Sequence, residues 1–228
     1  MDTLAALVQG FAVALQPVNL LFAFVGAVLG TAHPPGYILA LAIPSLFRLE
    51  TLLDHQIWSC IIGGGTVVLV GITGKEIAGP RVGLVAAGLA AMYPNVWFYD
   101  SVVMSETLIL FTTTLTILVA YRFARRPTIG LAIGLGVSVG AAALTRAESI
   151  LFVPLLIVPV AFWLREVDWR RRLQLFAVAI AATLVTTAPW VGYNLARFEH
   201  PVFLSSNLEL TLLSANCDET YYGPFLGF

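Results

Sequence analysis

Long apolar segments, separated by short polar ones, dominate the sequence. A helix that spans a lipid bilayer needs roughly 20 mostly apolar residues, with a range of about 17 to 25. Segments of this kind recur along the chain, and we expect a spanning helix at each of 11–31, 57–74, 82–99, 102–121, 128–145, 150–164 and 173–191. The sequence therefore predicts an all-α fold, a polytopic transmembrane helical bundle with about seven spans.

A further apolar segment, 36–47, is too short to cross a bilayer comfortably. Pro34 and Pro35 precede it and Pro44 interrupts it, and proline lacks the backbone N–H that a helix interior needs. We interpret the segment as an interfacial or re-entrant helix. The same prolines follow His33, which is either a site residue held at the outer interface or an incidental neighbour of a proline stop.

Basic residues are concentrated in three of the predicted loops. These loops, after spans two, four and six, hold nine of the twelve Lys and Arg residues: Lys75, Arg81, Arg122, Arg125, Arg126, Arg165, Arg170, Arg171 and Arg172. Cytoplasmic loops carry an excess of such residues. The pattern therefore predicts a cytoplasmic N-terminus and places the stretch from Gly192 onward outside.

Composition supports a membrane location. Hydrophobic residues make up 59% of the chain and charged residues only 11%, with a mean hydropathy of +0.89. A soluble domain is typically about half apolar and about a quarter charged. The net charge of −1 gives no indication of a nucleic-acid partner. The first partner that we expect is the lipid bilayer.

Two carboxylates, Asp100 and Glu106, interrupt an otherwise apolar run at the predicted outer ends of spans. A charged side chain at bilayer depth is costly and usually faces a polar interior, a cavity or a partner. One interpretation is a polar site. The other is that Asp100 is a hydrated loop acid and Glu106 a helix-end residue that reaches water. The apolar flanks favour the site for Glu106, whereas Asp100 is closer to an ordinary loop acid.

Arg146 and Glu148 join the fifth and sixth predicted spans. They are two positions apart, so their side chains should point to different sides in either a helix or a strand, and we do not expect them to pair. Arg is well suited to bidentate phosphate binding, and at the outer lipid boundary Arg146 fits a lipid-linked phosphate. The alternative is that Arg146 extends to the lipid headgroups without a specific ligand.

From His33 to about Trp190, and more loosely to the end, the chain resembles membrane glycosyltransferases of the GT-C superfamily. The similar branch is family 39-like and includes protein O-mannosyltransferases and the aminoarabinose transferase of lipid A. The resemblance depends on the order and spacing of several segments: His33-Pro34-Pro35-Gly36-Tyr37 with Ile38-Leu39-Ala40-Leu41, the inner loop Gly74-Lys75-Glu76-Ile77-Ala78-Gly79-Pro80-Arg81, Tyr93-Pro94, Met104-Ser105-Glu106-Thr107-Leu108 and Leu144-Thr145-Arg146-Ala147-Glu148.

The resemblance implies an active site under the outer helix ends, in a bacterial plasma (inner) membrane protein. A polyprenyl-phosphate sugar is the implied donor, and its sugar passes to an acceptor at the outer face. Glu106 and Asp100 are the catalytic candidates, and Glu106 would organise the donor phosphate, alone or through a divalent metal. His33, Arg146 and Glu148 are the donor-binding candidates. The sugar, the acceptor and any metal are left open.

One part of the family pattern is missing. The family places an acidic general base in the first external loop, but here Gly30-Thr31-Ala32, which directly precedes His33, contains no acid. The missing base therefore favours an inactive chain. Asp54 and Glu50 are substitute base candidates, provided that segment 36–56 folds back over the site.

Residues 1–31 resemble a different family, namely the start of the large membrane subunit of tripartite tricarboxylate transporters. We therefore expect a foreign N-terminal helix at 1–31 and a truncated GT-C membrane domain at 32–228, which ends before the further helices usual for these enzymes. Two alternatives to a glycosyltransferase remain. One is a tricarboxylate-type transporter subunit, and the other is a non-catalytic membrane fragment.

Overall fold

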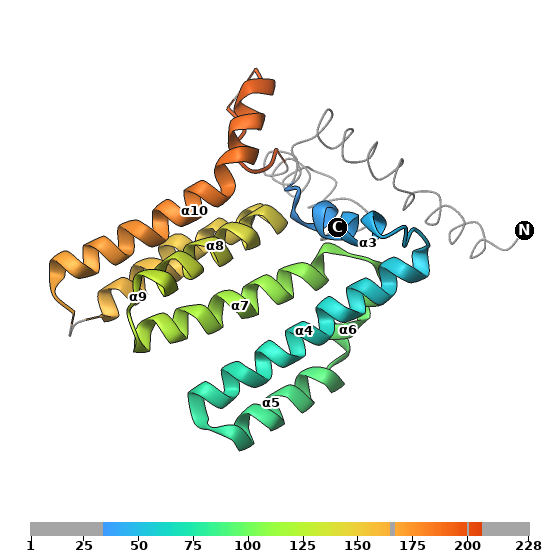
Figure 1. Ribbon diagram of the computed structural model, residues 1–228, viewed down its shortest axis with the longest axis horizontal. Coiled ribbons are helices and arrows are strands. Elements are labelled where there is room, and N and C mark those ends of the chain that lie inside the picture. Colours follow the sequence, from blue (N-terminus) through green and yellow to red (C-terminus); the bar gives the residue numbers. More distant parts are fainter. Residues whose placement is uncertain (1–33, 165–166, 200, 207–228) are drawn as a thin grey trace, which may run out of the picture.

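The structure, a computed structural model, describes residues 34–164, 167–199 and 201–206, and every regular element in these ranges is helical (Figure 1). The α-helices are α3 (Gly36–Leu46), α4 (Leu52–Ala78), α5 (Pro80–Met92), α6 (Pro94–Val102), α7 (Ser105–Arg125), α8 (Ile129–Thr145), α9 (Val158–Trp163) and α10 (Trp169–Arg197). A 3₁₀ turn, η1 (Ala147–Leu151), and a π-helical turn, η2 (Val153–Ile157), connect α8 to α9. The predicted all-α class is confirmed.

Three helices in the described part of the chain, α4, α7 and α10, are long and apolar enough to cross a membrane. Helices α5 and α6 meet at a bend of 48° and together make a fourth candidate, whereas α8 and the 147–163 stretch are apolar but shorter. All predicted spans from 57–74 onward thus coincide with helices. The first predicted span, 11–31, lies outside the described residues. An all-α membrane bundle is confirmed, and three to four of its helices are candidate spans by length and composition.

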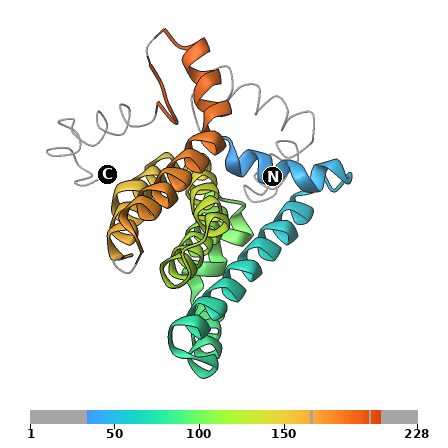
Figure 2. The same ribbon diagram turned by 60° about the vertical axis from the view of Figure 1, so that its left-hand side comes forward.

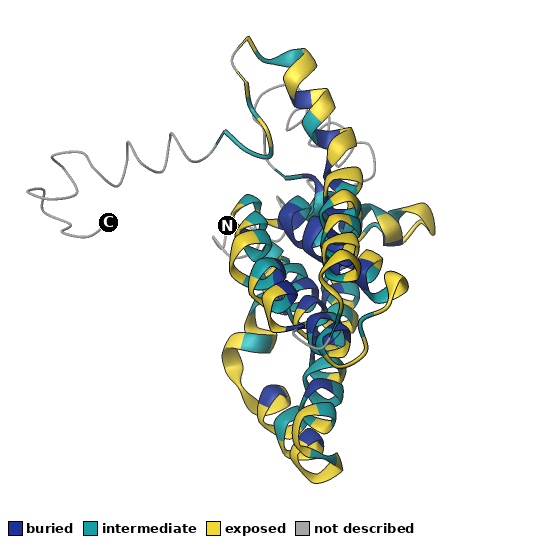
Figure 3. Ribbon diagram, turned by 90° about the vertical axis from the view of Figure 1, so that its left-hand side faces the viewer, coloured by how far each residue is buried: buried dark blue, intermediate teal, exposed yellow. Residues whose placement is uncertain are grey.

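The helices pack side by side along most of their length. Figure 1 shows α7 between α4 and α8, with α10 on the far side of α8 and α5 alongside α4. Buried residues lie where the helices face one another, while exposed residues follow their outer faces (Figure 3). The core is formed by Ala120, Phe123, Ala132, Leu135, Val139, Ile157, Leu164, Leu175 and Ala179. Many large apolar side chains on the outer faces are exposed, which suits contact with lipid.

Small residues bring α8 and α10 into close contact. A Cβ added at Gly136 would lie 2.1 Å from the Ala179 carbonyl oxygen, and one at Gly140 would lie 2.6 Å from Thr186 Cβ. The Thr183 hydroxyl donates a hydrogen bond of 3.1 Å to the Gly136 carbonyl across the same interface. Close backbone approach of this kind is a common way of packing helices in membranes.

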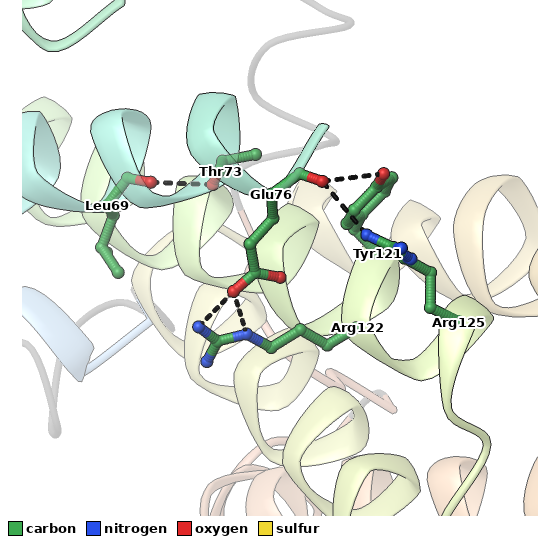
Figure 4. A network of polar contacts seen from close by, with 6 residues as sticks. All are labelled: Leu69, Thr73, Glu76, Tyr121, Arg122 and Arg125. Atoms are coloured by element: carbon green, nitrogen blue, oxygen red, sulfur yellow. Dashed lines mark hydrogen bonds and ion pairs between the residues drawn. The ribbon is translucent and has the colours of Figure 1, made fainter. Parts of the chain in front are cut away.

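One end of the bundle is basic, and hydrogen bonds connect α4 to α7 at this end. Glu76, in the last turn of α4, accepts a 2.8 Å hydrogen bond from Arg122 Nε (Figure 4). Its backbone carbonyl accepts from the Tyr121 hydroxyl and from Arg125 Nη1, both at 3.2 Å. The expected inner loop from 74 to 81 is mostly helical, because the turn between α4 and α5 is made at Gly79, whose φ of 95° suits glycine.

Helix α3 lies across the opposite end of the bundle. We call this end the polar end, because Asp100, Glu106 and Arg146 lie there. Figure 2 shows α3 running crosswise above the start of α4. Trp58 Nε1 donates a 2.9 Å hydrogen bond to the Ala40 carbonyl, and a Cβ at Gly36 would lie 2.7 Å from the Leu144 carbonyl oxygen. The short helix predicted at 36–47 is therefore present, and it covers the ends of α4 and α8.

Candidate functional site

Three charged side chains meet at the polar end. Glu106 is in the first turn of α7, Arg146 follows the last residue of α8, and Glu148 is in η1. Arg146 Nη1 lies 3.2 Å from Glu106 Oε1, and Arg146 Nε lies 2.7 Å from Glu148 Oε1. A carboxylate in the first turn of a helix also gains from the helix dipole, which favours Glu106 at this place. The arrangement is an arginine held between two acids.

The expectation that Arg146 and Glu148 would not pair is wrong. It assumed a regular backbone, but the chain changes conformation here: Arg146 is extended, with φ −142° and ψ 123°, and the 3₁₀ turn starts at Ala147. Neither helical nor strand spacing applies across such a junction, and the long arginine side chain can reach the acid that follows it. Glu148 is 62% exposed, Arg146 43% and Glu106 25%, so Glu106 is the most enclosed of the three.

The interpretation of Asp100 as an ordinary loop acid is also wrong. Asp100 is in α6, and only 4% of it is exposed. Its Oδ1 accepts a 2.7 Å hydrogen bond from the hydroxyl of Thr107, which is itself buried. Its other oxygen lies against Gly63 of α4, where an added Cβ would be 2.0 Å from Oδ2. A buried polar group normally has a partner, and Thr107 supplies one.

A second set of buried polar side chains lies between α3 and α4. His55 and Ser59 are fully buried on α4, and the hydroxyl of Tyr37 faces Ser59. Burial raises the pKa of Tyr37 to about 12, Ser59 opposes this rise, and the negative charges of Asp100 and Glu106 add to it. Tyr37 therefore stays protonated at neutral pH and can act as a hydrogen-bond donor.

Apolar segments alone do not reveal this buried set, although the sequence contains a signal for it. His55, Ser59, Gly63 and Thr66 recur at spacings of three and four along an otherwise apolar helix, and all of them are buried. Such a stripe marks one helix face. Here the buried face is polar or small, and the lipid-facing side is apolar.

The proposed substitute bases lie at the start of α4. Asp54 accepts hydrogen bonds from the Thr51 backbone N–H at 3.0 Å and from the Thr51 hydroxyl at 2.7 Å. The Thr51 hydroxyl in turn accepts from the Asp54 N–H, which completes a capping box. Glu50 comes directly before this cap. Asp54 thus has a structural role, and a role as base would compete with it.

Two further predictions concern His33 and a metal ion. His33 lies outside them, so its expected place in the donor pocket remains a prediction. In the part of the chain that the structure describes, no group of three or more His, Cys, Asp or Glu side chains is arranged to hold a metal ion. The carboxylate that we singled out for a metal, Glu106, has Arg146 as its partner.

An apolar cavity of about 480 Å³ opens at the same end of the bundle. Its walls come from the start of α3, the end of α8 and the C-terminal part of α10, which bends away from the bundle (Figures 1 and 2). The lining residues are Pro35, Leu39, Leu144, Thr186, Pro189, Trp190 and Tyr193. Because Leu144 is two residues before Arg146, the cavity and the arginine share the same end of α8.

The chain matches a known sequence family. Residues 32–193 match the sequence family described as dolichyl-phosphate-mannose-protein mannosyltransferase. No curated protein and no solved structure matches the chain. The matched range covers α3 to most of α10, including Glu106, Arg146, Glu148 and the apolar cavity.

Proposed function

The chain belongs to the dolichyl-phosphate-mannose-protein mannosyltransferase family, whose members are membrane glycosyltransferases of the GT-C type, and from this membership we propose its reaction. It moves a sugar from a polyprenyl-phosphate donor to an acceptor at the outer face of the membrane. The donor combines a negative phosphate with a long apolar chain. The polar end offers a partner for each part.

The observation that carries the proposal is the position of Arg146. Its guanidinium lies at the end of α8, partly exposed, and the same end of α8 lines the apolar cavity through Leu144. A guanidinium can donate several hydrogen bonds to one phosphate, and the cavity suits the first isoprenoid units of the lipid. We therefore assign Arg146 to the donor phosphate.

Binding of a phosphate changes the contacts of Arg146. Two carboxylates already accept from its Nη1 and Nε, and their negative charges repel a phosphate, so phosphate binding favours the release of one of them. Glu148 is more exposed than Glu106, and moving it into water costs less. We propose that Glu148 is displaced while Glu106 keeps the guanidinium oriented. A divalent metal at Glu106 is the alternative way for this carboxylate to organise the phosphate.

The proposed step is a substitution at the anomeric carbon of the sugar. An acceptor oxygen forms a bond to this carbon, the bond from the carbon to the phosphate oxygen breaks, and its electron pair stays on the polyprenyl phosphate. Arg146 stabilises the negative charge that develops there. The acceptor proton goes to a base, for which Asp54 and Glu50 remain the candidates.

The orientation of the protein is part of the proposal. The basic end, with Lys75, Arg122 and Arg125, faces the cytoplasm, and the polar end faces outward in a bacterial plasma membrane. The N-terminus is then cytoplasmic and the C-terminus outside. Reporter fusions at 126–128 and at 147–149 should give cytoplasmic and external signals, respectively. The reverse pair of signals would overturn this orientation.

A transfer assay tests the function. The full chain, reconstituted in vesicles with a radiolabelled polyprenyl-phosphate sugar and a bacterial lipid extract as acceptor, should release label from the donor. Glu106→Gln should lower the rate, because it removes the charge that orients Arg146. If the wild type transfers nothing from any polyprenyl-phosphate sugar supplied, the second candidate, a non-catalytic membrane fragment, replaces the first. The absence of an acid from Gly30-Thr31-Ala32 favours that second candidate.

The transporter alternative gains no support. It depended on residues 1–31, which lie outside the matched range of 32–193 and outside the residues that the structure describes. The division of the chain into a foreign helix at 1–31 and a transferase domain at 32–228 stays a proposal.

A further inference from the structure

The chain turns sharply between Asp100 and Glu106. Helix α6 ends at Val102, Val103 adopts a left-handed conformation with φ 54° and ψ 58°, and α7 begins at Ser105. A β-branched residue in this region is a conformational outlier, since its Cβ approaches the backbone too closely. Such a conformation persists only where the surrounding structure holds it in place.

Contacts around the turn hold it from three helices. Thr107 of α7 donates its hydroxyl proton to Asp100 Oδ1 of α6 at 2.7 Å, across the turn. Gln56 of α4 donates to the Ser101 carbonyl at 2.6 Å. The Asp100 carboxylate therefore links the two helices that meet at Val103, and α4 supports the same segment from the side.

The place of Asp100 depends on one glycine. At Gly63 an added Cβ would lie 2.0 Å from Asp100 Oδ2, so the carboxylate fits only because this position has no side chain. The next residue, Gly64, is different: an added Cβ there would meet nothing within 4 Å. Alanine at Gly63 therefore tests the contact with Asp100. Alanine at the adjacent Gly64 shows the general effect of an alanine in this helix.

We infer that Asp100 is a positioning residue, which holds the first turn of α7 so that Glu106 stays within reach of Arg146. Asp100 is only 4% exposed and cannot itself touch a substrate, whereas Thr107, its partner, is the residue directly after Glu106. The importance of this role for transfer rests on the proposed function, but the geometric part of the inference does not. This inference replaces the expected catalytic role of Asp100.

Two matched pairs of variants test the inference in the full chain. Gly63→Ala pushes on the carboxylate and Gly64→Ala does not, while Thr107→Val removes the hydroxyl and Thr107→Ser keeps it. In the transfer assay we expect Gly63→Ala and Thr107→Val to lower kcat/KM by roughly ten- to a hundredfold, the range for a small displacement of a positioned group. Gly64→Ala and Thr107→Ser should stay near the wild type.

Amide hydrogen exchange provides a readout that needs no activity. In Gly63→Ala and Thr107→Val, exchange should become faster at 101–108 and also at 144–149, because Arg146 loses a fixed partner. Glu106→Gln serves as the reference for the change at 144–149. If 101–108 loosens while 144–149 keeps its wild-type exchange, the contact is only structural and the inference is overturned. A wild type without transfer would instead refute the proposed function and leave this exchange test decisive.

Discussion

Glu106 and Arg146 are forty positions apart in the chain, yet Glu106 Oε1 and Arg146 Nη1 lie 3.2 Å from each other at the polar end of the bundle. The contact joins the first turn of α7 to the end of α8. Partly exposed ion pairs contribute only about 0–1 kcal/mol to stability. Loss of this pair should therefore affect the chemistry at the polar end more than it affects folding.

Replacement of Arg146 by lysine keeps the positive charge and removes the planar guanidinium. We expect Arg146→Lys to raise the KM for the polyprenyl-phosphate sugar and to lower kcat/KM by about tenfold or more, because an ammonium group cannot make the bidentate contacts. Thermal unfolding should change by no more than a few degrees for a loss of about 1 kcal/mol. An Arg146→Lys variant with wild-type kinetics would show that any local positive charge suffices.

Removal of the second acid should have the opposite effect. Glu148→Gln leaves Arg146 with Glu106 as its charged partner, so an incoming phosphate has less to displace. We expect the donor KM to fall several-fold, which corresponds to roughly 1 kcal/mol. Steady-state kinetics at increasing donor concentration measure the change. A higher donor KM would mean that Glu148 binds the donor and does not compete with it.

A conservative substitution distinguishes the proposed role of Asp54 as a base from its role in the helix cap. Asp54→Asn keeps an oxygen that can accept from Thr51 and removes the charge that a base needs. If Asp54 is the base, transfer should fall by about a hundredfold or more while thermal stability changes little. Asp54→Ala provides the comparison, with a stability loss of about 1 kcal/mol from the cap. Normal transfer by Asp54→Asn would leave Glu50 as the remaining candidate of the two.

Because α8 packs closely against α10, substitution of a glycine at their interface should lower the stability of the protein, although no charged group is involved. At Gly136 a new Cβ would meet the Ala179 carbonyl oxygen, whereas at Gly130 it would meet nothing within 4 Å. Gly136→Ala should therefore destabilise the protein by about 1–3 kcal/mol, and Gly130→Ala should not. Thermal unfolding of both variants in the same detergent measures the difference. Equal melting temperatures would show that α8 and α10 can move apart without cost.

Spacing of apolar residues was sufficient to locate the helices, but it misplaced some of their ends. Helix α4 begins at Leu52, five residues before the predicted span at 57–74, because the capping box of Thr51 and Asp54 starts a helix through polar residues. A search for apolar segments overlooks such a start. The bend between α5 and α6 has a visible signal in Tyr93-Pro94, since proline disfavours helix in the residue before it.

The site was harder to predict because its contacts join distant segments. The burial of Asp100 requires Gly63 from α4 and Thr107 from α7, and no local pattern around Asp100 indicates either of them. The pairing of Arg146 with Glu148 depends on the change from α8 to η1, where periodicity rules do not apply. Local sequence could identify which residues carry charge, and the packing of helices decided which of them meet.

The central claim is that Glu106 and Arg146 act together on the donor phosphate, and a double-mutant cycle tests it most directly. Transfer kinetics are measured for the wild type, Glu106→Gln, Arg146→Gln and the double variant. The claim predicts strong coupling, with the double variant losing little more kcat/KM than Arg146→Gln alone. Losses in kcat/KM that multiply independently, or a wild type without any transfer, would contradict the claim.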